Sequence, residues 1–259
     1  MMPDSPVIRI KNLKKSYGEK EVLKGIDLDI YPGQVIGYIG PNGAGKSTTV
    51  KILTGLLPEF DGDIEVFGKD LRKNALQLKK RIGYVPEAAE MYDVLTPMEF
   101  LDFIGKLYEM DENRVAKRAE RLLAFFELDS NKNDRMDTFS KGMRQKVLLI
   151  SGLLHDPQII FLDEPLSGLD ANAVIKVKNI IDRLAKEGKT IFYCSHMMDV
   201  VEKVSNRILL INHGEIVADG TFEELKQRDD ESLERVFSNL TGNQQVEDNT
   251  DEFLQSFKD

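Results

Sequence analysis

One short stretch limits what this chain can fold into more than any other. Residues 40–48 read Gly-Pro-Asn-Gly-Ala-Gly-Lys-Ser-Thr, after the apolar run 35–39 and before a helix-like segment at 49–53. All fixed positions of G-x-x-x-x-G-K-[ST] are filled, from Gly40 to Ser47. Glycines let backbone N–H groups surround a polyphosphate, and the following helix directs its positive end at the same anion. The stretch predicts a phosphate-binding loop between a strand and a helix.

Every residue of this loop is a candidate contact to a bound nucleotide. Lys46 is expected to reach the terminal phosphates, and the Ser47 hydroxyl is placed to bind Mg²⁺. The alternative is a tight turn that binds nothing, and the complete motif in its strand-loop-helix context argues against it. The predicted contacts are Gly40, Pro41, Asn42, Gly43, Ala44, Gly45, Lys46, Ser47 and Thr48.

Charge and cysteine content exclude several classes of function. The 259 residues include 35 Lys and Arg against 44 Asp and Glu, a net charge of −9, and one Cys. An acidic chain without an evident basic cluster is not expected to bind nucleic acid. One cysteine excludes an internal disulfide or a cysteine-based metal site. No leader and no apolar stretch of membrane-spanning length are evident, so we expect a cytosolic protein that reaches a membrane only through a partner.

The order of predicted elements indicates an α/β fold. Residues 7–30 alternate like antiparallel strands, and helical periodicity dominates from 88 to 157. The first of these helices begins at Thr96, where Glu99 completes a capping box. Strands and helices alternate again from residue 159. From residue 221 we expect a short helical extension and a polar, acidic tail, to residue 259.

Two carboxylates supply what a phosphate-binding loop lacks for hydrolysis. Asp163 and Glu164 follow the apolar strand 159–162, whose carboxyl end should lie at the same sheet edge as the loop. Asp163 is expected to join the Mg²⁺ shell, and Glu164 to orient the attacking water. The alternative is an acidic pair that only caps the next helix. His196 ends another apolar strand, and we expect it to contact the γ-phosphate, although a lone histidine there is more often structural.

A second helix start has the properties of an anion site. Ser140 is expected to be the N-cap of a helix that begins with Lys141 and Gly142. Since the chain has one phosphate-binding loop, this helix end serves either a different phosphate or a nucleotide held by another copy.

Together these motifs resemble the ATP-binding subunits of ABC transporters, from residue 7 to about 240. The corresponding motifs occur in the family order: Tyr17 (A-loop), 40–48 (Walker A), Glu87 (Q-loop), 140–143 (signature), 159–163 (Walker B) with Glu164, 167–170 (D-loop) and His196 (switch histidine). The resemblance implies a RecA-like P-loop NTPase core over 1–87 and 158–220, an antiparallel β subdomain, and an inserted α-helical subdomain over 88–157.

The resemblance also implies partners and further site residues. Two copies, or one copy and a related ATPase subunit, would sandwich two ATP molecules between Walker A of one subunit and Ser140 and Gly142 of the other. Tyr17 and Asp170 would be further nucleotide contacts, with Ser47, Glu87 and Asp163 around Mg²⁺. A transmembrane permease at the inner face of the cell membrane would dock beside residues 87–95, with Met91 and Tyr92 as candidate contacts.

Three residues depart from the family pattern. Met143 lacks the usual glutamine contact to the sugar, Lys141 adds a positive charge beside the phosphates, and Glu87 adds a negative one. The signature and residues 233–242 look most similar to bacterial exporter-type members with an unfused ATPase, which suggests export of a drug, antibiotic, peptide or lipid-like substrate. The alternatives are an ABC-type ATPase acting on DNA or the ribosome, and a nucleotide-gated regulator that scarcely hydrolyses ATP.

Overall fold

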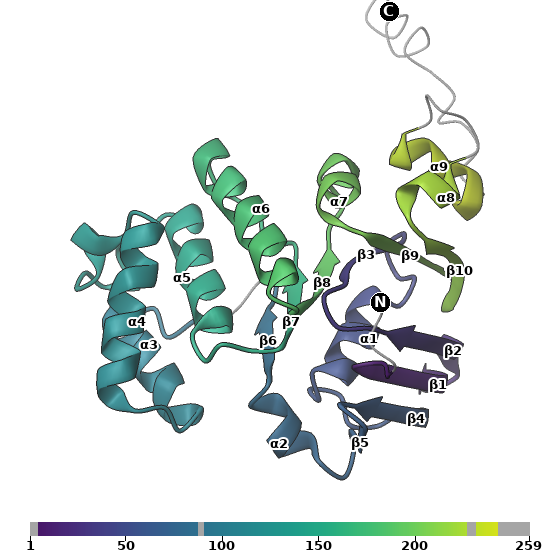
Figure 1. The fold of residues 1–259 in the computed structure, drawn as a ribbon, viewed down its shortest axis with the longest axis horizontal. Coiled ribbons are helices and arrows are strands. Elements are labelled where there is room, and N and C mark those ends of the chain that lie inside the picture. Colours follow the sequence, from purple (N-terminus) through teal and green to yellow (C-terminus); the bar gives the residue numbers. More distant parts are fainter. Residues whose placement is uncertain (1–4, 88–90, 227–231, 243–259) are drawn as a thin grey trace, which may run out of the picture.

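A six-stranded sheet forms the centre of the protein (Figure 1). The computed structural model describes residues 5–87, 91–226 and 232–242. The strand order is β10-β9-β3-β8-β7-β6, parallel from β9 to β6, with β10 antiparallel to β9. The strands are β3 (Val35–Ile39), β6 (Ile82–Val85), β7 (Ile159–Asp163), β8 (Thr190–Cys194), β9 (Arg207–Asn212) and β10 (Glu215–Gly220). All residues of β3 and β8 are buried, as expected for strands covered on both faces.

A second, antiparallel sheet packs beside the first. Its order is β2-β1-β4-β5, and its strands are β1 (Ile8–Tyr17), β2 (Lys20–Ile30), β4 (Asp61–Val66) and β5 (Lys69–Asp70). A turn directly after Tyr17 joins β1 to β2, as the predicted antiparallel pairing within residues 7–30 requires. One hydrophobic core, including Leu23, Ile36 and Val50, joins this sheet to α1 (Lys46–Leu53) and to the six-stranded sheet. The antiparallel β subdomain therefore holds the phosphate-binding loop and its helix from one side.

Three longer helices lie between β6 and β7 in the sequence and to one side of the sheet in space (Figure 1). They are α3 (Pro97–Leu107), α4 (Glu112–Phe125) and α5 (Lys141–Leu153). The capping box at Thr96 is present, with Thr96 and Glu99 each bonding the other's backbone N–H. Leu101, Leu123 and Ile150 share one buried core with α6 (Ala171–Lys186) and the sheet. The helical insertion is thus confirmed in the described residues, whereas its exact limits remain a prediction.

The remaining helices are short. They are α2 (Ala75–Lys79), α7 (Met198–Val204), α8 (Phe222–Leu225) and α9 (Leu233–Thr241), with 3-10 turns at Asp129–Asn131 and Met136–Thr138. The second capping box, at Thr221, begins α8. The predicted acidic tail, 243–259, lies outside the described residues. Within the described ranges, no helix has the length and apolar character needed to cross a membrane.

Candidate nucleotide-binding site

A cavity of about 250 Å³ lies at the carboxyl ends of the parallel strands. Its walls come from β2, from the loop between β3 and α1, and from the residues that follow β6, β7 and β8. It is lined by Lys20, Val22, Asn42, Gly43, Gly45, Lys46, Ser47, Thr48, Glu87, Asp163, Glu164 and His196. The fold therefore brings most of the predicted loop together with both predicted carboxylates, Glu87 and His196.

The phosphate-binding loop has a shape that only glycine permits at two positions. Gly45 has φ 117°, and a Cβ there would lie 2.6 Å from the Leu23 side chain. A Cβ on Gly40 would lie 2.2 Å from the carbonyl oxygen of Ile211. The helix that starts at Lys46 has no side-chain cap and no acidic residue in its first turn. Its first N–H groups are consequently available to an anion.

Lys46 is held at the mouth of the loop by two backbone oxygens. Its Nζ donates hydrogen bonds to the carbonyl oxygens of Gly40, at 2.6 Å, and Pro41, at 3.1 Å. Burial lowers the pKa of the Lys46 ammonium, and nearby carboxylates, among them Asp163 and Glu164, oppose this effect. Since an ammonium group has three donors, one N–H remains for a phosphate oxygen.

The carboxylate of Glu164 is fixed by the residues at the end of β8. Its Oε2 accepts a hydrogen bond from Ser195 Oγ at 2.9 Å, and its Oε1 accepts one from the backbone N–H of His196 at 2.7 Å. The imidazole Nε2 of His196 lies 3.7 Å from the same Oε1. The backbone N–H of Glu164 donates to the carbonyl oxygen of Cys194, so the segment after β7 is tied to β8. Sequence reasoning missed Ser195, and its place directly before His196 was the one available signal.

The surroundings of Asp163 are suited to a divalent cation. Burial, followed by the charges of Glu87 and Glu164, raises the pKa of Asp163. In the described parts of the chain, no three His, Cys, Asp or Glu side chains lie close enough together to hold a metal by themselves. Mg²⁺ is commonly held by one or two carboxylates together with substrate phosphates. Asp163, Glu87 and the Ser47 hydroxyl fit a magnesium ion that enters with a polyphosphate.

Outside the loop, four predicted contacts do not line this cavity. Tyr17 ends β1 with half of its surface exposed, and its register partner Lys20 lines the cavity. Ser140 caps α5 by accepting a hydrogen bond from the Met143 N–H at 3.2 Å, and neither it nor Gly142 lines the cavity. Asp170 caps α6 through the Ala173 N–H and pairs with Lys146 at 3.2 Å. Within one chain, Ser140, Gly142 and Asp170 are therefore separate from the cavity.

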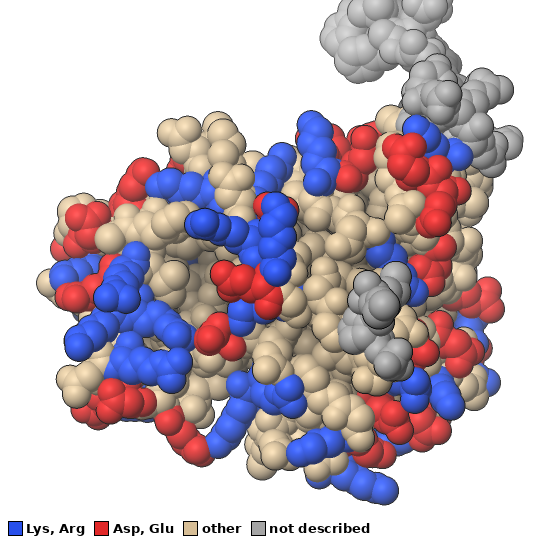
Figure 2. All heavy atoms as spheres, viewed as in Figure 1, with Lys and Arg blue, Asp and Glu red and all other residues tan. Residues whose placement is uncertain are grey.

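The helical region carries a cluster of positive charge. Arg114, Lys117, Arg118 and Arg121 follow the spacing i, i+3, i+4 and i+7 on α4, which places them on one helix face. Figure 2 shows Lys and Arg gathered on this side of the molecule. The expectation that the chain lacks a basic cluster is therefore wrong for α4, and helical periodicity alone could have revealed it.

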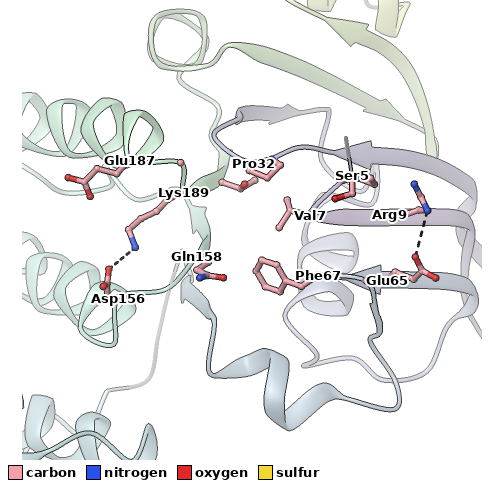
Figure 3. Close-up of a pocket in the computed structure, with 14 residues that line it drawn as sticks. Ser5, Val7, Arg9, Pro32, Glu65, Phe67, Asp156, Gln158, Glu187 and Lys189 are labelled. Atoms are coloured by element: carbon pink, nitrogen blue, oxygen red, sulfur yellow. Dashed lines mark hydrogen bonds and ion pairs between the residues drawn. The ribbon is translucent and has the colours of Figure 1, made fainter. Parts of the chain in front are cut away.

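A larger cavity, of about 730 Å³, lies at the opposite, amino-terminal edge of the parallel strands (Figure 3). Four of its five charged side chains pair with one another: Asp156 with Lys189 at 2.6 Å, and Arg9 with Glu65 at 3.8 Å. None of the predicted site residues lines it. Cavity size alone would therefore have selected the wrong edge of the sheet.

Comparison with known proteins gives a consistent result. A family model described as ABC transporter matches residues 23–167. The linearmycin resistance ATP-binding protein LnrL of Bacillus subtilis is 36% identical, over 86% of this chain and 71% of LnrL. The daunorubicin resistance ATP-binding protein DrrA3 of Streptomyces coeruleorubidus is 34% identical, over 85% of this chain and 69% of DrrA3.

Solved structures agree with these relatives. The ATP-binding subunit of an ABC transporter superposes with a TM-score of 0.85 and 28% identity, over 91% of this chain and 99% of that chain. A dimeric ATP-binding cassette in a post-hydrolysis state with ADP and phosphate superposes with a TM-score of 0.76 and 26% identity, over 83% of this chain and 98% of that one. The similarity thus extends over both sheets and the helical region.

Proposed function

Because the chain belongs to the ABC transporter family of ATP-binding proteins, we propose that its 250 Å³ cavity binds ATP with Mg²⁺ and that a second copy completes the site. The protein is an ATP-hydrolysing subunit that powers a separate transmembrane permease. One observation carries the assignment of the site: the phosphate-binding loop, Asp163, Glu164 and His196 line the same cavity.

Within this cavity each side chain has a distinct task. Lys46 and the N–H groups at the start of α1 bind the phosphates. Ser47, Asp163 and Glu87 hold Mg²⁺, which, when bound, neutralises charge that develops on the phosphate oxygens. The carboxylate of Glu164, oriented by Ser195 and His196, accepts a hydrogen bond from the attacking water and directs it toward the γ-phosphate.

The second copy supplies the surface that the cavity lacks. The positive end of α5, with Ser140 and Gly142, faces the γ-phosphate held by the other subunit, and Asp170 adds a contact across the interface. Tyr17, exposed beside the cavity, stacks on the base. The dimeric, ADP- and phosphate-bound relative supports this arrangement, and we propose a homodimer.

The permease docks on exposed apolar side chains of the helical region. Tyr92, Val94 and Phe103 are 60%, 61% and 38% exposed, and the rings of Tyr92 and Phe103 meet edge to face at 5.6 Å. Met91, in contrast, packs partly against the core. Relatives named for antibiotic resistance favour export of a drug or lipid-like substrate over action on DNA or the ribosome.

Substitution Glu164→Gln tests this assignment. Loss of the base should reduce ATP turnover by roughly 100- to 10,000-fold while nucleotide binding persists, so that an ATP-bound dimer accumulates. Turnover, nucleotide affinity and size-exclusion profile in ATP are the measurements. Glu187→Gln, at the opposite edge of the sheet, is the matched control. Turnover at the parental rate would remove Glu164 from the reaction.

A further inference from the structure

Three side chains of α5 reach the segment 164–170, which connects β7 to α6. Lys141 Nζ lies 2.8 Å from Ser167 Oγ, and the buried Gln145 donates from Nε2 to the carbonyl oxygen of Pro165 at 3.2 Å. Lys146, mostly buried, pairs with Asp170 at 3.2 Å. The start of α5 is thus fastened to both ends and the middle of this segment.

Lys141 makes the contact at the middle of the segment. Its methylene groups lie along Gly168, where an added Cβ would be 3.1 Å from both Cγ and Cδ of the lysine. The two backbones are also close, since a Cβ on Gly142 would lie 2.6 Å from the carbonyl oxygen of Gly168. The Lys141 ammonium is therefore directed at its own chain.

In the segment that Lys141 holds, Leu166 is buried in the core and Leu169 packs against that core, whereas Gly168 is exposed. The segment begins at Glu164, which adopts a positive φ of 45°, and Gly168 follows with φ 76°. Two turn hydrogen bonds link its backbone: from Ser167 N–H to the Glu164 oxygen, and from Leu169 N–H to the Leu166 oxygen. The first of these bonds joins the backbone of Ser167 directly to that of Glu164.

We propose that Lys141 is a positioning residue that holds Ser167, and through it the backbone of Glu164, against the amino-terminal end of α5. This proposal rests on the proposed role of Glu164. The ammonium group of Lys141 is directed at Ser167 in its own subunit, whereas the sequence led us to expect it beside the phosphates. The helix end offered to the partner's nucleotide and the segment that bears the chain's own base then move as one unit.

A double-mutant cycle tests the proposal. Lys141→Met and Ser167→Ala should each lower kcat roughly three- to tenfold, as expected for the loss of one typical exposed hydrogen bond, with KM for ATP unchanged. The double variant should be no slower than the slower single variant, and Lys141→Arg should recover activity because it keeps a donor. Lys186→Met, which removes an exposed lysine of α6, is the matched control.

Two kinetic results would overturn the proposal. If Lys141→Met weakens ATP binding while Ser167→Ala changes nothing, Lys141 contacts phosphate. If the two effects on kcat multiply, the residues act independently.

A readout without turnover separates this proposal from the role of Glu164. In the nucleotide-free protein, both variants should speed hydrogen exchange at the backbone amides of positions 167 and 169, and unchanged exchange would refute the contact. If Glu164→Gln retained full turnover, the assignment of Glu164 as the base would be wrong. The exchange result would still support the contact between Lys141 and Ser167.

Discussion

The first turns of α1 and α5 are chemically similar, but their N-caps differ. Neither has an acidic residue in its first turn, so both leave the helix dipole uncompensated by the chain itself. At α1 the N-cap is Gly45, which has no side chain, and the N–H groups are left open. At α5 the N-cap is Ser140, whose hydroxyl already bonds the Met143 N–H.

This difference in capping indicates different roles for the two helix ends in nucleotide binding. The open end of α1 is complete only when an anion satisfies its N–H groups, so binding and local order are linked there. At the α5 end the Met143 N–H is already capped within one chain, and Lys141, Gln145 and Lys146 hold this end in place. We infer that α1 captures the nucleotide and that α5 then closes over it as a preformed surface.

The largest effect on nucleotide binding is expected from the α1 end. Lys46→Ala should weaken nucleotide binding by roughly 10- to 100-fold, because it removes a charge-assisted hydrogen bond to phosphate. Equilibrium binding of a fluorescent ATP analogue to the isolated chain measures it. Lys20→Ala, which removes another lysine at the rim of the same cavity, should change affinity much less. Equal losses in both variants would mean that only general positive charge matters.

Blocking the α5 end should strongly reduce ATP turnover without weakening nucleotide binding. Ser140→Arg should reduce turnover on the order of 100-fold, as loss of a phosphate-directed donor does, with nucleotide affinity in the isolated chain unchanged.

Mixing the Lys46→Ala and Ser140→Arg variants tests whether the α1 and α5 ends act across two subunits. A dimer of one Lys46→Ala and one Ser140→Arg subunit keeps a single intact pairing of α1 and α5 ends. Turnover should therefore reappear on mixing, whereas a site built within one chain would give none.

The smallest effect concerns stability. Ser140→Ala should cost about 1 kcal/mol of unfolding free energy, because the Met143 N–H loses its cap. Ser232→Ala is the matched control, since that N-cap side chain makes no capping hydrogen bond with α9. Chemical denaturation of both variants gives the comparison. Equal midpoints for the two variants would show that the cap at α5 contributes nothing.

Much of the architecture could be predicted because its signals are local. Capping boxes at Thr96 and Thr221, the turn after Tyr17 and the apolar runs of β7 and β8 each depend on residues near one another in sequence. Parallel strands place their carboxyl ends at one edge, which is why the loop, Asp163 and His196 could be expected together.

What could not be predicted depends on contacts between distant residues. Ser195 bonds Glu164 across 31 positions and Lys141 bonds Ser167 across 26. No local pattern distinguishes these from other exposed or strand-end polar residues. The short elements β5 and α2 were missed for a related reason: two and five residues carry too little periodicity to detect.

The neighbouring strands β6 and β7 also have a consequence for how the protein folds. Ile82 pairs with Ile159, so the whole helical region must be spanned before these strands meet. Closing a flexible segment of roughly 75 residues costs about 4 kcal/mol of chain entropy. Helices α3 and α4, which pack closely where Gly105 meets Val115, can form within that segment first and shorten it. We therefore expect the strand end that bears Glu87 to join the sheet late, after the phosphate-binding loop has formed.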